Sequence, residues 1–289
     1  MIPLNEYKTV DFKSGLYVVA TPIGNLRDIT QNAITILSKS DIILCEDTRT
    51  SKKLINRFNI KYKKLISYHK FNEKKNLSLV INSLKEGKIL SIISDAGTPC
   101  ISDPGQILIK ECVKENINIF SIPGPSSVIS ALSISGFSDR FIFYGFFPEK
   151  NKIIENDLLN LSKQNISIIF FISAKKFKNI IVHLSKYFPD RKILICKELT
   201  KLHEQHFRLD VLDLQKFSEE LRGEITLVIS EKLNFESSNK LDDKNKKLIK
   251  KLIKKFSIKD VVTEIKKNND ISKREIYNYC LKIKNEKKK

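Results

Sequence analysis

The sequence predicts an α/β protein of two α/β domains, followed by a small basic helical segment at the C-terminus. Two observations carry this prediction. Short apolar runs alternate with helical patterns through most of the chain, which is typical of a parallel sheet flanked by helices. Some of these runs, such as Ile89–Ile93, are almost continuously apolar, as expected for strands covered on both faces. A length of 289 residues suffices for two modest domains.

The first predicted domain spans residues 1–147. Each expected strand is a short apolar run, and a helical pattern follows it along the chain. Strands are expected at Leu16–Thr21, Ile42–Glu46, Lys64–Tyr68, Ile89–Ser94, Ile117–Ile122 and Phe141–Phe146. Helices are expected at Thr30–Ser38, Ser51–Phe58, Asn76–Glu86, Gln106–Glu115 and Ser126–Ser135.

The second predicted domain spans residues 148–234 and begins with a polar linker at Pro148–Asn156. A second α/β unit follows this linker. A disorder-prone segment, Glu236–Lys244, leads out of the domain. The strands of the second domain are expected at Ser167–Ile172, Lys192–Cys196, His203–Val211 and Ile225–Ser230.

The C-terminal region, residues 235–289, is expected to form three short helices that pack together. Ser257 with Asp260, and Ser272 with Glu275, each resemble a capping box at a helix start. From Lys240 to Lys289 there are 18 basic and 7 acidic residues, so this stretch holds +11 of the net charge of +19. The charge suggests a polyanionic partner such as nucleic acid, although a genome biased toward Lys, Ile and Asn would also produce it.

Several kinds of protein are excluded. No apolar run approaches the roughly 20 residues of a membrane-spanning helix, and Met1–Phe12 lacks the apolar core of a signal peptide. A cytoplasmic protein without a membrane partner is therefore expected. The five cysteines include no C-x-x-C pair, which argues against a disulfide framework and a zinc site. His203 and His206 fall on opposite faces of an expected strand without a third ligand nearby, so no metal is expected.

Three loops rich in glycine and proline mark the expected ligand site. No two glycines are closer than eight positions, which excludes the G-x-G-x-x-G and G-x-x-x-x-G-K motifs. The loops Thr21–Leu26, Ser94–Gly105 and Pro123–Ser127 instead each follow an expected parallel strand. Most such clusters are only turns. Because ligands bind at the carboxyl ends of parallel strands, however, these three loops are expected to meet at one cleft.

The loops belong to a larger set of motifs that runs in order over nearly the whole chain. By these motifs the chain resembles the tetrapyrrole (corrin/porphyrin) methylase superfamily, and within it the branch of 16S rRNA cytidine 2'-O-methyltransferases. The Ser94–Gly105 loop is highly specific for that branch. The motifs are Ala20–Thr30, Glu46–Thr50, Ser67–His69 with Asn72 and Glu73, Ser94–Gly105, Ile122–Ser126, Lys197–Thr200, Arg222–Glu224 and Ser272–Tyr277.

The resemblance implies a two-domain fold that binds S-adenosylmethionine in the cleft between the domains, as a homodimer. Where the family shows Tyr-Glu-Ser-Pro-His-Arg, this chain has Phe171–Lys176, which removes polar groups from the second-domain side of the cleft. Carried over by position, the cofactor contacts are Pro22, Asp95, Ala96, Gly97, Ile101, Ser102, Ser126, Ser127, Phe171 and Thr226.

Methyl transfer from a sulfonium is an in-line displacement that needs alignment and no metal. Because a ribose hydroxyl is a weak acid, a base or a hydrogen-bond acceptor is expected to assist. Glu46, His69 and Asp95 are the catalytic candidates, all near expected strand ends. His69 is equally well a surface histidine, and the neighbouring Asp47 is as well suited to capping a helix as to catalysis.

Four basic residues are expected to contact RNA phosphates: Arg27, Arg49, Lys273 and Arg274. Tyr68, Phe71 and Tyr144 are candidates for stacking on an unpaired base, with core packing as the alternative for Tyr144.

Three alternative functions are compatible with these features. The first is S-adenosylmethionine-dependent 2'-O-methylation of a cytidine in the decoding region of 16S rRNA, within the small ribosomal subunit. The second is methylation of a tetrapyrrole intermediate, a reaction in which the basic helical tail would have no obvious role. The third is a non-catalytic RNA-binding protein, suggested by the altered Phe171–Lys176 segment.

Overall fold

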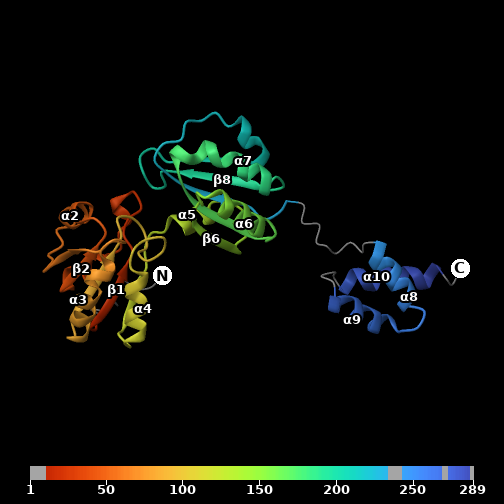
Figure 1. Cartoon of the computed structure of the whole chain (residues 1–289), viewed down its shortest axis with the longest axis horizontal. Helices are drawn as coiled ribbons and strands as arrows, with labels where there is room; N and C mark the ends of the chain where they lie inside the picture. The colour runs from red at the N-terminus through yellow and green to blue at the C-terminus, as the bar shows by residue number, and fades with distance from the viewer. Residues whose placement is uncertain (1–10, 234–242, 269–272, 287–289) are drawn as a thin grey trace, which may run out of the picture. The chain divides into compact units, whose positions relative to one another are not determined.

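The computed structural model describes residues 11–233, 243–268 and 273–286. Contacts divide the chain into two compact units, Met1–Glu231 and Lys232–Lys289. The first unit holds two five-stranded sheets, which we call the N-terminal lobe and the second lobe (Figure 1). The predicted α/β class is confirmed, and three helices follow in the second unit.

The sheet of the N-terminal lobe is entirely parallel, as predicted. Its strand order is β3-β2-β4-β1-β5. In the middle of the sheet, Leu16 lies between Leu90 and Ile119 on the neighbouring strands. The strands are β1 (Gly15–Val19), β2 (Ile42–Cys45), β3 (Leu65–Ser67), β4 (Ile89–Ile93) and β5 (Ile119–Ile122).

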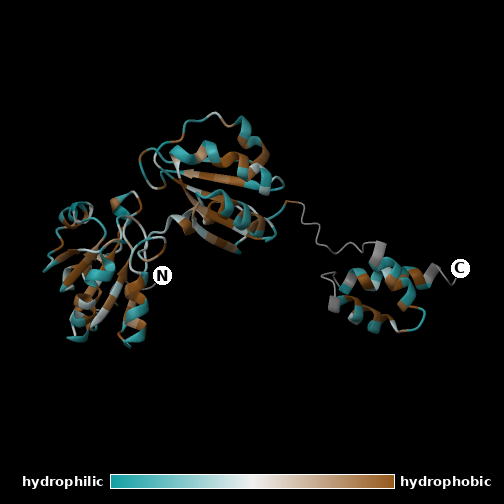
Figure 2. Cartoon of the chain, in the orientation of Figure 1, coloured by the Kyte–Doolittle hydropathy of each residue, from teal (hydrophilic) through white to brown (hydrophobic). Residues whose placement is uncertain are grey.

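Both faces of this sheet are covered, which explains the nearly continuous apolar strands. Successive side chains point to opposite faces, so Leu44 packs into one core cluster and Ile43 into the other. One cluster includes residues of α3 (Glu73–Lys85) and α4 (Gln106–Lys114), and the other includes residues of α1 (Gln31–Lys39) and α2 (Thr48–Arg57). Figure 2 shows the strands predominantly apolar and the outer faces of the helices polar.

The second sheet is mixed, and it includes a strand that was predicted in the first domain. Its order is β6-β7-β10-β8-β9. The strand β6 (Phe141–Phe146) was expected within residues 1–147, but it pairs in parallel with β7 (Ser167–Ser173). The remaining pairs are antiparallel. The other strands are β8 (Lys192–Lys197), β9 (Gln205–Asp210) and β10 (Glu224–Ile229).

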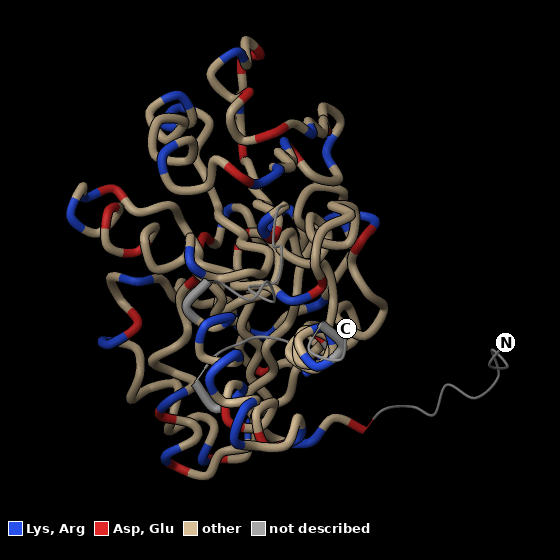
Figure 3. The backbone as a smooth tube through the Cα atoms, turned by 90° about the vertical axis from the view of Figure 1, so that its right-hand side faces the viewer, with Lys and Arg blue, Asp and Glu red and all other residues tan. Residues whose placement is uncertain are grey.

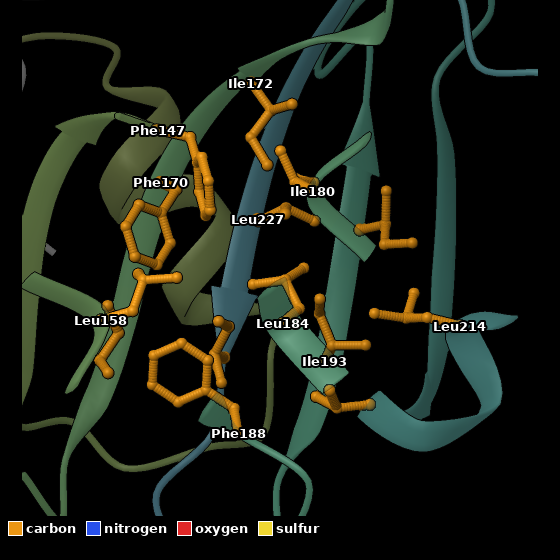
Figure 4. Packing of buried hydrophobic residues seen from close by; sticks show 14 of the residues in the cluster. Phe147, Leu158, Phe170, Ile172, Ile180, Leu184, Phe188, Ile193, Leu214 and Leu227 are labelled. Atoms are coloured by element: carbon orange, nitrogen blue, oxygen red, sulfur yellow. The ribbon is translucent and has the colours of Figure 1, made fainter. Parts of the chain in front are cut away.

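The predicted linker Pro148–Asn156 is wrong for most of its length, because α6 (Asn151–Ser162) begins within it. The helix buries Ile154, Leu158 and Leu161, which share one helical face at spacings of four and three residues. Together with α7 (Phe177–Tyr187), α6 covers one face of the second sheet, where Phe170 and Leu184 lie in the core (Figure 4).

The opposite face of the second sheet packs against α5 and against the loop after β1 of the N-terminal lobe. Val128 and Ala131 of α5 (Ser127–Ser133) join Ile169, Leu194 and Val228 of the sheet in one apolar cluster. Ile23, from the loop after β1, belongs to the same cluster. This cluster therefore holds the two lobes together.

The second unit is a three-helix cluster of α8 (Asp243–Leu252), α9 (Ile258–Asn268) and α10 (Lys273–Glu286). Ile249, Val261 and Ile276 form part of its core. Ser257 caps α9, because its Oγ accepts a hydrogen bond from the Asp260 N–H at 3.3 Å. The second expected capping residue, Ser272, lies outside the described residues.

Basic residues recur along the described part of the chain, where Figure 3 draws them in blue. Over the residues whose placement is described, none of the helices has the length and apolar character to cross a membrane.

Candidate active site

The three predicted loops meet at the carboxyl ends of β1, β4 and β5. Thr21 and Gly97 exchange two backbone hydrogen bonds, of 2.9 and 3.1 Å. The Oγ1 of Thr98 donates to the carbonyl oxygen of Pro125 at 3.3 Å. Each loop is therefore bonded to the next, and the predicted convergence is confirmed.

A pocket opens where these loops face the second lobe. The N-terminal lobe contributes backbone and small side chains, and the second sheet contributes aromatic and aliphatic side chains. Both lobes thus shape one ligand-sized site, at the strand ends where α/β proteins bind ligands. The lining residues are Ile23, Ala96, Gly97, Thr98, Ile101, Asp103, Ser126, Ser127, Val128, Phe146, Phe171, Ile172, Cys196, Leu199, Glu224, Ile225 and Thr226.

Seven of the ten predicted cofactor contacts line this pocket. Pro22 and Asp95 line a smaller neighbouring pocket under α2 instead. The side chain of Ser102 lies beside Gly145, where an added Cβ would come within 3.2 Å of the Ser102 Oγ. The seven are Ala96, Gly97, Ile101, Ser126, Ser127, Phe171 and Thr226.

The Ser94–Gly105 loop has a strained backbone on either side of Ile101, which lines the pocket. Cys100 and Ser102 have φ values of 68° and 64°, in the left-handed region that side chains with a Cβ rarely adopt. Gly97 and Gly105 also have positive φ. Strain of this kind persists only where surrounding contacts enforce it, and it is concentrated at functional sites.

The loop after β8 approaches the first loop from the opposite side. A Cβ on Gly24 would lie 2.5–2.8 Å from atoms of Leu199, Thr200 and Lys201, so only glycine fits there. The N–H of Asn25 donates to the Thr200 Oγ1 at 3.0 Å. The two lobes are thus hydrogen-bonded beside the pocket.

Three carboxylates, those of Glu46, Asp47 and Asp95, lie near one another at the ends of β2 and β4. Asp95 accepts a hydrogen bond from the N–H of Asp47 at 3.2 Å. Burial, together with the charge of Asp95, raises the pKa of Glu46 above its ordinary value. Burial also raises the pKa of Asp95. Both groups are therefore stronger bases than ordinary carboxylates. Because the charge of Asp95 acts on Glu46, the structure also brings these two of the three catalytic candidates together.

Asp103 lines the pocket and was not singled out from the sequence. Burial raises its pKa to about 6, and the charges of Glu46 and Asp95 act in the same direction. The only feature of the sequence that could have pointed to Asp103 as a pocket residue is its place two positions before Gly105 in the long loop. Whether that side chain faces the pocket or solvent depends on the left-handed turns at Cys100 and Ser102, which the sequence does not reveal.

The third catalytic candidate, His69, sits in a turn after β3. Its Nδ1 accepts a hydrogen bond from the N–H of Phe71 at 3.3 Å. Its positive form would lower the pKa of Glu46, so the two groups are close enough to interact. Asp47 caps α2, because its carboxylate accepts from the N–H of Arg49 at 2.8 Å. The capping interpretation of Asp47 is confirmed.

The three stacking candidates differ in exposure. Tyr68 is buried, and its burial raises the pKa of its hydroxyl. The Tyr144 hydroxyl donates to Asp157 at 2.5 Å, and burial raises its pKa to about 12. Phe71 is 94% exposed, so of these three only Phe71 presents its ring to solvent.

The basic candidates are separated in the structure. Arg27 lines a shallow surface hollow together with Arg57, which the sequence analysis did not single out. Arg49 forms an ion pair with Asp47 at 2.7 Å. Lys273 is exposed at the start of α10. The side chain of Arg274 lies outside the described residues. No group of three or more possible metal ligands occurs within residues 11–233, 243–268 and 273–286.

The fold and the site together define a two-lobed α/β protein with a ligand pocket between its lobes. A family model described as Tetrapyrrole (Corrin/Porphyrin) Methylases matches residues 15–215. The chain therefore belongs to the tetrapyrrole methylase family. It is a methyltransferase, and its cofactor is S-adenosylmethionine.

Two curated relatives carry the same name, Ribosomal RNA small subunit methyltransferase I. The protein from Thermotoga maritima is 43% identical over 220 residues, which are 75% of this chain and 98% of that protein. The protein from Rickettsia prowazekii is 40% identical over 280 residues, which are 94% of this chain and 98% of that protein.

Solved structures share the fold at low sequence identity. The uroporphyrin-III-C-methyltransferase from Thermus thermophilus has a TM-score of 0.53 at 15% identity, covering 75% of this chain and 94% of that chain. A diphthine synthase has a TM-score of 0.57 at 12% identity, covering 76% and 91%. These similarities confirm the two-lobed architecture.

Proposed function

We propose that this chain methylates the 2'-hydroxyl of a cytidine ribose in the decoding region of 16S rRNA. The observation that carries the proposal is the pocket shared by the two lobes, in a chain that is 43% and 40% identical to proteins named for methylation of small-subunit ribosomal RNA. S-adenosylmethionine occupies this pocket, and the RNA ribose approaches its open side.

The pocket has the chemistry that this cofactor requires. Ile101, Phe171 and Ile225 offer apolar surface for the adenine, while Ser126 and Thr226 offer hydroxyls for polar groups. S-adenosylmethionine also has a sulfonium and an ammonium group, both positive. The carboxylate of Asp103 lines the same pocket and complements that charge, whereas the carboxylate of Glu224 is paired with Lys201 at 2.9 Å. The residues present therefore fit the cofactor.

The protein contributes alignment and proton acceptance. Holding the ribose hydroxyl in line with the methyl group supplies most of the rate enhancement for such a displacement. Glu46, His69 and Asp95 are the proposed acceptors of the hydroxyl proton or of its hydrogen bond. Burial raises the pKa of Glu46 and of Asp95, which makes each a stronger proton acceptor than an ordinary carboxylate.

Arg27 and Arg49 of the first unit, and Lys273 and Arg274 of the helical unit, are each proposed to bind phosphates of the RNA. Phe71, with its exposed ring, is available for stacking on a base. The substrate is the RNA within an assembled small subunit in the cytoplasm, and the active form is a homodimer.

The test uses purified protein, S-adenosylmethionine with a labelled methyl group, and small ribosomal subunits from a strain that lacks this protein. Label is expected in 16S rRNA, in a dinucleotide that resists alkaline digestion, because a methylated 2'-oxygen cannot attack the adjacent phosphate. Label in a base, or in 23S rRNA, would contradict the proposal.

A second candidate function is methylation of a tetrapyrrole intermediate. The observation in its favour is the name of the matching family, together with the solved uroporphyrin-III-C-methyltransferase of the same fold. An enzyme that labels uroporphyrinogen and not ribosomal RNA would support this alternative. Cofactor binding without transfer to either substrate would favour a non-catalytic RNA-binding protein.

A further inference from the structure

A second pocket lies within the second lobe and is used by nothing described so far. It has a volume of about 410 Å³, within the range of roughly 300–1,000 Å³ typical of small-molecule sites. It is formed by the end of β6 and the segment after it, the start of α6, the end of β7, and α7. Its lining residues are Phe146, Phe147, Pro148, Glu149, Asn151, Ile154, Phe171, Ile172, Ser173, Lys176, Asn179, Ile180 and His183.

This second pocket shares a wall with the cofactor pocket. Phe146, Phe171 and Ile172 line both. The rings of Phe146 and Phe171 meet edge to face with centroids 5.6 Å apart. A group held in the second pocket is therefore separated from the cofactor pocket by side chains only, and a substrate could place one part in each.

The lining has the character of a nucleobase site. Phe146 is 63% exposed, although it is a large aromatic residue, and it offers a surface for stacking. Asn179 and His183 provide hydrogen-bond donors and acceptors on the adjoining helix face, over a floor that includes the buried Ile180. An aromatic surface beside amide and imidazole groups is how proteins recognise unstacked bases.

The charge of the lining favours a base over a polycarboxylate. Lys176 and His183 are the basic residues among those that line this pocket. Lys176 is already paired with Glu149. A ligand with several carboxylates would leave most of its charge uncompensated there, whereas a neutral heterocycle would not.

We propose that this second pocket receives the unstacked base of the target nucleotide, so that its ribose lies beside the Phe146–Phe171 wall and faces the cofactor. This inference rests on the proposed RNA methylation. A base held in this way would fix the position of its 2'-hydroxyl, which is the alignment that the displacement needs.

The test uses substitutions that line only the second pocket. Asn179→Ala and His183→Ala each remove a polar group from it, while Lys178→Ala and Val182→Ala change exposed residues of α7 that do not line it. We expect the first two to lower kcat/KM for labelling of small subunits about tenfold, through the KM for the RNA, since a lost hydrogen bond in such a site has this size. The controls should match the wild-type enzyme.

The affinity for S-adenosylmethionine, measured by calorimetry without RNA, should stay unchanged in all four variants. If the wild-type enzyme labels RNA and Asn179→Ala and His183→Ala label it equally well, the inference is overturned while the proposed function stays intact. A loss of cofactor affinity in these variants would also overturn it, because the pocket would then hold part of the cofactor. A wild-type enzyme that fails to label RNA would instead refute the proposed function itself.

A bulky substitution gives an independent test. Asn179→Trp adds volume at the exposed helix face that borders the pocket, so it should block RNA labelling while the thermal midpoint and cofactor affinity remain near wild-type. Full labelling activity in Asn179→Trp would contradict a base in this pocket.

Discussion

Asp103 shows how a single partly buried carboxylate connects the site to the stability of the protein. Burial raises its pKa to about 6, so the folded state disfavours its charged form. A carboxyl group of this kind contributes stability that is fully present below its ordinary pKa of 3.8 and is lost as the pH rises to about 6.

The substitution Asp103→Asn should remove this contribution, because the amide does not ionise. We expect the urea midpoint of the variant to fall less than that of the wild-type protein between pH 4 and pH 6. The measurement is a series of urea denaturations across that range, with Asp139→Asn as an exposed control. An identical slope in Asp103→Asn and the wild-type protein would contradict the assignment.

Arg191 is a buried cation that binds backbone carbonyls instead of a carboxylate. It is fully buried, and its guanidinium donates to the carbonyl oxygens of Ser162, Gln164, Ile166 and Ser230. Burial lowers its pKa below the ordinary value. The side chain thereby joins the end of α6 and the loop after it to the end of β10.

Replacing Arg191 with Met should destabilise the fold by about 3 kcal/mol, because several buried carbonyl groups would lose their donors. The measurement is the free energy of unfolding in denaturant. Arg140→Met, at an exposed arginine, serves as the control and should change the free energy little. Equal stabilities of the two variants would show that water replaces the guanidinium.

At the scale of elements, the contact between the loops after β1 and β8 determines whether the lobes meet correctly. Gly24→Ala would place a Cβ 2.8 Å from the backbone oxygen of Leu199, and backbone cannot swing aside as a flexible side chain can. We expect a loss of about 1–3 kcal/mol of stability from this overpacking, together with weaker binding of S-adenosylmethionine.

Cofactor affinity by calorimetry and thermal midpoints would test this expectation. Gly87→Ala is the control for replacing a glycine where space is open, since its Cβ would meet nothing within 4 Å. Its φ of 81° adds a backbone strain that Gly24→Ala does not have, so the comparison is made on cofactor affinity. If Gly24→Ala bound the cofactor as well as Gly87→Ala does, the loop contact would have no part in shaping the pocket.

The strand β6 was predicted in the first domain, whereas the structure places it in the second lobe. The apolar run Phe141–Phe146 was identified correctly as a strand, but it follows the last strand of the first sheet in sequence. Periodicity identifies a strand without naming its partner. Pairing with β7, and the packing of α5 against the second sheet, place both elements in the second lobe.

At the scale of the whole molecule, the helices α8, α9 and α10 form a compact unit of their own, whereas the residues that line the pocket all belong to the first unit. The Thermotoga maritima relative is matched over 98% of its length by 220 residues of this chain, whereas the Rickettsia prowazekii relative is matched by 280. Of these two relatives with the same name, the Thermotoga maritima protein is therefore the shorter one. Many lysines of the helical unit are exposed, as expected of a surface that binds phosphates.

Removing residues 240–289 should weaken binding to RNA or to the small subunit and reduce its dependence on salt, since fewer counterions would be released. Cofactor binding should remain, because the pocket lies in residues 23–226. Binding titrations at several salt concentrations would measure both effects. An unchanged salt dependence in the truncated protein would show that the helical unit does not contact the RNA.

The sequence by itself determined the strands and helices of the N-terminal lobe and the convergence of its three loops. These features depend on local periodicity and on the rule that parallel strands end at one edge of a sheet. The tertiary structure alone decided that β6 joins the second sheet, that Asp103 faces the pocket, and that Phe146 and Phe171 separate two pockets. Each of these depends on contacts between distant segments or on left-handed backbone turns, which leave no periodic trace in the sequence.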